Sequence, residues 1–213
     1  MHQASTPTST ASRILKRIRS LGRGSVFVPV DFLDLGSREA VDTSLGRLAA
    51  QGTIRRIGRG VYDFPRSHQR FGPRSPSADA VAGAVARSHG ESICHDGTRA
   101  ANLLGLSTQV PAQAIYLTDG TNRTFHVDLV GGRGFDIRFK RSRRLTGGNS
   151  KAGLALRALR HLGRDGIDGR TIAQLRTSLD DKDTRELQRL RPRAAGWLRA
   201  HVDRVLAGPE AAA

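Results

Sequence analysis

Residues 52–65 read GTIRRIGRGVYDFP, and this stretch decides how the N-terminal part of the chain folds. Two short runs rich in β-branched and aromatic residues, 53–57 and 61–64, flank the glycine-rich turn Gly58-Arg59-Gly60. That pattern is typical of a β-hairpin. Pro65 ends it, because proline has no N–H to donate to a strand ladder. The sequence therefore predicts a hairpin with an arginine at its tip.

The residues before the hairpin predict three helices and one short strand. A first helix is expected to begin at a Ser12 cap and to end before Gly22, and residues 25–28 are expected to form the strand. Pro29 suits the first position of a second helix that reaches residue 35. A Ser37 cap then begins a third helix that runs to about Gln51. The full order, including the hairpin, predicts a winged helix-turn-helix over residues 12–66.

The remaining chain predicts a second domain over residues 78–207, reached through a linker at residues 67–77 that is rich in Pro, Gly and Ser. Residues 1–11 and 208–213 are expected to be tails. The second domain is expected to carry a small antiparallel sheet, with strands over residues 114–118, 123–130 and 135–139. Helices are expected over residues 78–88, 98–106, 151–162, 168–179, 181–190 and 194–206. The predicted fold class is α+β with a helical C-terminal end.

Composition favours a polyanionic partner. Thirty-five Lys and Arg against nineteen Asp and Glu give a formal net charge of +16, and only four of the basic residues are lysine. The excess of arginine suits phosphate and guanine edges, although codon usage in a GC-rich genome explains it equally well. Residues 12–74 are the most basic part for their length, with 13 basic and 5 acidic side chains. Nucleic acid is favoured over membrane, since no basic helix of the membrane-surface type stands out.

The sequence also predicts the compartment. No stretch has the eighteen or so consecutive apolar residues that a membrane span needs. The Ser- and Thr-rich start lacks the pattern of a signal peptide. The single cysteine, Cys94, excludes an internal disulfide. We therefore expect a cytoplasmic protein with no membrane partner.

The expected third helix and hairpin provide a candidate interface for double-stranded DNA. One face of the helix offers side chains to base edges in the major groove, and the hairpin offers arginines to the backbone or the minor groove. The glycines on either side of Arg59 are expected to let the hairpin backbone approach a polyanion closely. The alternative is a protein-docking module, but the exposed helix face has no large apolar residue. The candidate DNA-binding residues are Arg38, Glu39, Thr43, Arg47, Arg55, Arg56 and Arg59.

No catalytic, metal or cofactor site is predicted. The motifs HExxH, GxxxxGK[ST], GxSxG and CxxC are all absent. Cys94 and His95 are expected to point to opposite faces of an extended segment, so they do not form a thiol–imidazole pair. A metal-dependent nuclease built on Asp128 and Asp136 stays an alternative, although Arg138 stands where such a site would carry lysine. The basic run 140–144 is a solvated loop, a second phosphate-contacting patch or a surface that meets an RNA-directed enzyme.

Four stretches resemble the AbiEi-type antitoxin family. They are GSVFVPVDFLDLGSR at residues 24–38, GTIRRIGRGVY at 52–62, AANLLGLSTQVP at 100–111 and YLTDG at 116–120. With the C-terminal helices, the resemblance covers about residues 12–205. The two motif regions in this order and at this spacing are more specific than the hairpin motif alone.

The resemblance implies an antitoxin of a type IV toxin–antitoxin system and no enzyme. Members of that family repress their own promoter through the winged helix, at operator inverted repeats. Their second domain neutralises a nucleotidyltransferase-like toxin encoded beside them, without need of a stable complex. Two alternatives remain: a winged-helix transcription factor with an effector-binding second domain, and the metal-dependent nuclease.

Overall fold

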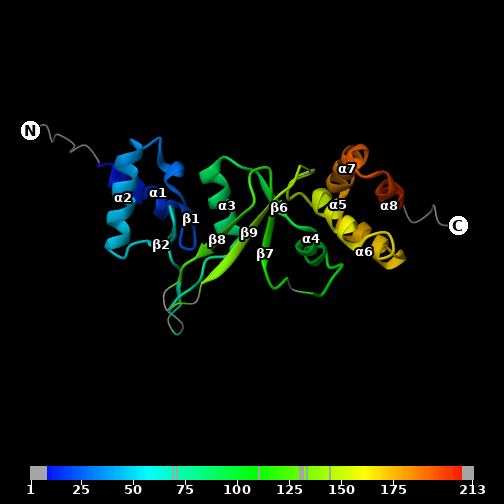
Figure 1. Ribbon diagram of the computed structural model, residues 1–213, viewed down its shortest axis with the longest axis horizontal. Helices are drawn as coiled ribbons and strands as arrows, with labels where there is room; N and C mark the ends of the chain where they lie inside the picture. The colour runs from blue at the N-terminus through cyan, green and yellow to red at the C-terminus, as the bar shows by residue number, and fades with distance from the viewer. Residues whose placement is uncertain are drawn as a thin grey trace, which may run out of the picture. The chain divides into compact units, whose positions relative to one another are not determined.

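The computed structural model has a mixed α+β fold and describes residues 9–68, 70, 72–109, 111–129, 132, 134–143 and 145–207 (Figure 1). It divides into two compact units, each made of two segments. Unit 1 comprises residues 1–91 and 124–137, and unit 2 comprises residues 92–123 and 138–213. No helix among the described residues is long and apolar enough to cross a membrane.

Some expectations from the sequence fall outside the described residues. Most of the two expected tails, residues 1–8 and 208–213, lies outside them. So do Val130, the expected end of one strand, and Arg144, the last residue of the basic run.

Unit 1 begins with two helices and a small sheet. Its elements are α1 (Thr10–Leu21), β1 (Val26–Phe27), the 3₁₀ helix η1 (Pro29–Phe32), α2 (Arg38–Ala50), β2 (Arg55–Gly58), β3 (Val61–Asp63), β4 (Ser67–His68), β5 (Gly72–Pro73) and α3 (Ala78–His89). The first sheet is antiparallel with order β1-β3-β2. The predicted hairpin is confirmed as β2 and β3, paired through Arg56 and Tyr62.

Local hydrogen bonds correct three of the expectations. The cap of α1 is Ser9 and not Ser12, because the Ser9 hydroxyl accepts the N–H of Ser12 at 3.3 Å. The expected second helix is only one 3₁₀ turn, in which the Asp31 carboxylate accepts the N–H of Val28 at 2.9 Å. The expected linker contains the strand pair β4–β5, with Ser67 opposite Pro73.

A compact apolar core positions α2 in unit 1. Its members come from α1, α2, the first sheet and the segments beside them: Ile14, Ile18, Phe27, Phe32, Val41, Leu45, Leu48, Ile54 and Tyr62. The helix α3 also packs on this unit. Arg87 of α3 donates to both carboxylate oxygens of Asp31, at 2.8 and 3.0 Å, and to the backbone oxygen of Val26. Unit 1 therefore extends past residue 66, where the first domain was expected to end.

Unit 2 is mostly helical. Its elements are β6 (Ile93–His95), α4 (Gly97–Leu103), β7 (Ala114–Thr118), α5 (Lys151–Leu162), α6 (Gly169–Ser178), α7 (Asp181–Leu190), the 3₁₀ helix η2 (Arg191–Arg193) and α8 (Gly196–Leu206). A four-stranded sheet has the order β6-β7-β9-β8, where β8 is Arg123–Val127 and β9 is Phe135–Arg141. The chain passes from one unit to the other within β8 and β9. The strand β6, which was not expected from the sequence, pairs antiparallel with β7.

The helix α5 forms the centre of the unit 2 core. Every residue from Ala152 to Leu159 is buried, and α5 packs against α4, α7 and α8. The approach to α4 is close: a Cβ atom at Gly97 would lie 2.5 Å from the Cβ of His161 and 3.0 Å from the backbone oxygen of Arg157. Glycine at position 97 therefore sets the distance between the two helices.

Replacing Gly97 tests this packing. We expect Gly97→Ala to destabilise the protein by about 1–3 kcal/mol, because neither the helix backbone nor a Cβ atom can move aside cheaply. Gly169→Ala is the matched control. Gly169 lies at the first position of α6 behind an aspartate cap, as Gly97 does in α4, but nothing packs within 4 Å of the position that its Cβ would take. Urea unfolding of both variants measures the difference, and equal stabilities would contradict the packing argument.

Candidate nucleic-acid interface

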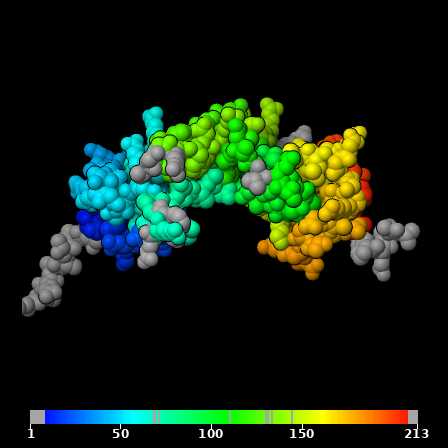
Figure 2. Space-filling view, turned by 90° about the horizontal axis from the view of Figure 1, so that it is seen from below, coloured from blue at the N-terminus to red at the C-terminus, as the bar shows by residue number. Residues whose placement is uncertain are grey.

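The helix α2 presents a polar face opposite its buried one. Val41 and Leu45 are fully buried in the unit 1 core. Glu39, Thr43 and Arg47 are exposed and lie four residues apart, so they share one face. Figure 2 shows the light-blue and cyan surface that α2 and the following hairpin contribute to unit 1. The structure therefore exposes the three side chains that were expected to face base edges.

Arg38 is exposed but already has a carboxylate partner. Its Nε donates to Asp42 at 2.8 Å, and both side chains are exposed. An exposed pair of this kind, one helical turn apart, contributes little to stability. A phosphate group would compete with Asp42 for this guanidinium.

Arg55 lies in a different environment from the other candidate residues. Its guanidinium forms a two-pronged ion pair with Asp63 on β3 and also donates to the backbone oxygen of Arg74 at 2.8 Å. The Arg55 side chain is 16% exposed and that of Asp63 only 2%. These hydrogen bonds hold the base of the hairpin, and we assign Arg55 to that structural task and not to DNA.

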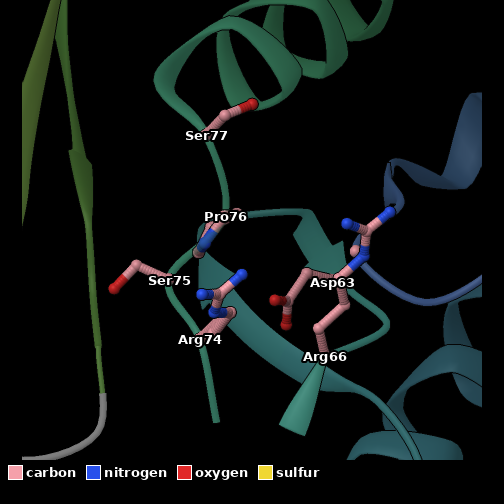
Figure 3. Close-up of a pocket in the computed structure, with 7 residues that line it drawn as sticks. Asp63, Arg66, Arg74, Ser75, Pro76 and Ser77 are labelled. Carbon is pink, nitrogen blue, oxygen red and sulfur yellow. The ribbon is translucent and has the colours of Figure 1, made fainter. Parts of the chain in front are cut away.

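A pocket of about 270 Å³ lies at the base of the hairpin (Figure 3). Figure 3 shows the Asp63 carboxylate and the Arg74 guanidinium directed into the space between β3 and the start of α3. Arg66 borders the same pocket, and its Nε donates to the backbone oxygen of Arg23 at 2.6 Å. The pocket holds both signs of charge, with Asp63 already paired to Arg55. The lining of this pocket therefore favours neither anions nor cations.

The hairpin has two exposed arginines, and its backbone packs closely against the rest of unit 1 at Gly58. Arg56 and Arg59 are exposed, and Gly60 has a φ of +69°, which suits a tight turn. Gly58 is buried, and a Cβ there would lie 2.5 Å from the Cζ of Phe125. Gly58 is therefore needed for packing inside unit 1, and not for the close approach to a polyanion that was expected of it.

Internal ion pairs compensate most of the negative charge in this region. Of the five acidic residues in 12–74, four contact the guanidinium of an arginine. The fifth, Glu39, has no ion pair within the described ranges. The hydrogen bonds from Arg17 lower the pKa of Asp34, so that this carboxylate stays ionised. The four pairs are Arg17–Asp34, Arg38–Asp42, Arg55–Asp63 and Arg87–Asp31.

Three of the candidate arginines keep an uncompensated charge. In the described part of the chain, Arg47, Arg56 and Arg59 have no ion pair with a carboxylate. Arg56 makes a long hydrogen bond of 3.4 Å to the backbone oxygen of Gly58. These three side chains are the ones best placed to meet phosphate groups.

The carboxylates of the nuclease alternative share a histidine. His126 lies 2.6 Å from Asp136 through Nδ1 and 3.6 Å from Asp128 through Nε2. The hydrogen bond to Asp136 is the main cause that raises the pKa of His126. Among the residues that the structure describes, no group of three or more His, Cys, Asp or Glu side chains has an arrangement that could hold a metal ion.

Cys94 and His95 follow the alternation expected of an extended segment. They lie on β6, where Cys94 is fully buried and His95 is partly exposed. Burial raises the pKa of the Cys94 thiol, so the thiol is neutral at physiological pH. Such a thiol packs as a small apolar group.

Comparison with known proteins gives one family and no function. Residues 13–187 match a protein family described as "Family of unknown function (DUF6088)". No curated protein matches the chain. The family match covers most of unit 1 and most of unit 2.

Asp63→Asn tests whether the buried ion pair holds the hairpin. We expect a loss of about 3 kcal/mol in the free energy of unfolding, because Arg55 would keep its charge in a mostly buried site without its partner. Asp34→Asn removes a carboxylate from an exposed pair with Arg17 and serves as the control, with a much smaller effect. Chemical unfolding measures both, and similar losses in the two variants would show that the Arg55–Asp63 pair has no special weight.

Proposed function

We propose a function for this chain from the chemistry of its own surface. The chain belongs to the DUF6088 family, whose function is unknown. In this proposal the chain is the antitoxin of a type IV toxin–antitoxin system. Residues 12–66 act as a winged helix-turn-helix that binds inverted repeats in the promoter and represses the operon. The second domain neutralises a nucleotidyltransferase-like toxin. The protein works in the cytoplasm and is not an enzyme.

The DNA-binding part of this proposal depends on one observation, the exposed and unpaired cations of α2 and the hairpin. Arg47 on α2 and Arg56 and Arg59 on the hairpin are exposed and have no carboxylate partner among the described residues. Neutralising phosphates with such groups releases counterions, which favours binding. The element order α1, β1, η1, α2, β2, β3 and the sheet order β1-β3-β2 support the winged-helix interpretation.

The face of α2 also suits the reading of bases. The arginine fork of residue 47 matches the O6 and N7 acceptors of guanine, and Thr43 can bond to several bases. Glu39 accepts a hydrogen bond from cytosine and repels nearby phosphates, so it adds discrimination at a cost in affinity. Two protomers on two half-sites would match an inverted repeat.

The antidote part of the proposal depends on the resemblance to the AbiEi-type antitoxins. The structure supports it in one respect: unit 2 has an apolar core of its own, centred on α5. A domain with its own core can act separately from the DNA-binding surface. The alternative of a transcription factor with an effector-binding second domain is favoured by one feature of unit 2, a pocket beside the buried Arg157.

Gel-shift titrations with promoter DNA test the interface. We expect Arg47→Ala to weaken operator binding by about 1–3 kcal/mol and to relax base preference, because a bidentate contact to guanine is lost. The double variant Arg56→Ala with Arg59→Ala should weaken binding to all sequences and flatten the dependence on salt, because phosphate contacts are lost.

A double variant in unit 2 is the control for charge alone. Arg170 and Arg189 are exposed on α6 and α7, so Arg170→Ala with Arg189→Ala removes the same net charge from elsewhere. We expect near wild-type binding from this control. Equal affinity of the control, the hairpin variant and Arg47→Ala for the promoter would overturn the proposed interface.

Toxin rescue tests the division of labour. The hairpin double variant Arg56→Ala with Arg59→Ala should lose repression of a promoter–reporter but still rescue growth from the toxin. Exposed arginines usually contribute less than about 0.5 kcal/mol to stability, so the second domain should stay folded. Leu104→Asp should abolish rescue, because Leu104 is 5% exposed in the unit 2 core and a carboxylate there would be unpaired.

The assay is colony survival with toxin and variant on separately induced plasmids. Immunoblots of the soluble fraction show whether each variant accumulates. A hairpin variant that is soluble and fails to rescue would mean that the antidote activity needs DNA binding, which contradicts the proposal.

A further inference from the structure

A pocket of about 170 Å³ lies within unit 2, between α5, η2 and the start of α8. The two α-helices that border this pocket, α5 and α8, are labelled in Figure 1. Both apolar and cationic side chains line the pocket. Its lining residues are Leu117, Ser142, Thr146, Leu156, Arg157, Arg160, Arg193, Ala194 and Leu198. Among the described residues, three arginines and no acidic side chain line this pocket.

Arg157 differs from the other two arginines because it is buried, and no described residue supplies a counter-ion. Only 8% of the residue is exposed. Its two terminal nitrogens donate to the backbone oxygens of Thr146 and Gly148, but its buried Nε has no hydrogen-bond partner. A buried guanidinium keeps its proton, and a buried charge costs free energy unless an opposite charge compensates it.

No group in the described part of unit 2 supplies that opposite charge. Arg157 takes part in no ion pair there, and the Cys94 thiol, which interacts with it electrostatically, is neutral because burial raises its pKa. Burial also lowers the pKa of Arg157, which means that the site disfavours an uncompensated positive charge. An anion in the pocket would remove this cost.

The rim of the pocket adds two further cations. Arg160, one helical turn after Arg157 along α5, and Arg193 in η2 are both exposed, and neither has an ion pair among the residues that the structure describes. Leu117, Leu156 and Leu198 add apolar surface to the lining. Such a surface suits an apolar body and disfavours a small, strongly hydrated anion such as inorganic phosphate.

We infer that this pocket binds a small organic carboxylate, with its charged end on Arg157, Arg160 and Arg193 and its apolar body on the three leucines. The size agrees, since a cavity of about 150 Å³ accepts a benzene-sized group. A planar carboxylate also matches the guanidinium fork. The site shares no residue with the proposed DNA interface, which is formed by residues of unit 1.

Titration calorimetry on the full chain tests the inference, with sodium benzoate as the probe at constant ionic strength. Benzyl alcohol has the same ring without the charge, and inorganic phosphate has charge without the ring. We expect benzoate to bind and to raise the melting temperature, and both comparison compounds to bind at least about tenfold more weakly. Equal binding of benzoate and benzyl alcohol, or tighter binding of phosphate, would overturn the inference, as would no binding of benzoate at millimolar concentration.

Variants show whether the pocket is the site. Arg160→Gln with Arg193→Gln should weaken benzoate binding about tenfold, whereas Arg170→Gln with Arg189→Gln removes the same charge and should leave it unchanged. Ala194→Leu should block binding by filling the pocket while all three arginines remain. These variants avoid Arg157, whose loss would free the loop that it holds. Equal benzoate affinities of the two double variants and Ala194→Leu would place the site elsewhere. Arg47→Ala should bind benzoate normally even if it no longer binds DNA.

Discussion

The arrangement of unit 1 depends on one buried ion pair, between Arg55 and Asp63. Asp63 ends the central strand β3 and lies opposite both Val26 of β1 and Arg55 of β2. Its carboxylate is almost fully buried and paired with one guanidinium, which also binds the backbone of Arg74. This pair joins β2, β3 and the segment before α3. It therefore fixes the base of the hairpin and, through it, the direction in which Arg56 and Arg59 leave the surface.

The same pair shows how the chain divides its arginines between structure and binding. In unit 1, Arg17, Arg38, Arg55 and Arg87 are engaged by carboxylates, which stabilises local structure and compensates negative charge. Arg47, Arg56 and Arg59, which have no carboxylate partner among the described residues, can then attract a polyanion over a distance of about one Debye length. In unit 2, Lys151 and Arg191 are likewise paired with carboxylates, but Arg157 is buried and has no carboxylate partner among the described residues. A site with a missing counter-ion is one that a ligand can complete.

Local sequence patterns predicted most helices and strands well, and their failures have physical causes. The strand at 114–118 and the helices at 151–162 and 181–190 match the structure residue for residue, and each of the two helices begins after a capping side chain, Ser150 or Asp180. The three-residue strand β6 gives no such periodic signal. The pair β4–β5 lies in a stretch rich in Pro and Gly that resembles a linker. Helix α3 joins unit 1 through the contact of Arg87 with Asp31, 56 residues away in the chain, and no local pattern predicts that contact.

The sequence by itself determined the α+β class, the strong positive charge, the hairpin and the exposed face of α2, because each follows from composition or from short-range spacing. Only the tertiary structure decided which arginines are free. Arg55 and Arg56 are neighbours in the chain, yet one is paired with a buried carboxylate and the other is exposed. Arg157 and Arg160 lie one helical turn apart, yet only Arg157 is buried with an unpaired nitrogen. The reason is that burial and pairing depend on residues distant in the sequence, which are brought close only by the packing of the core.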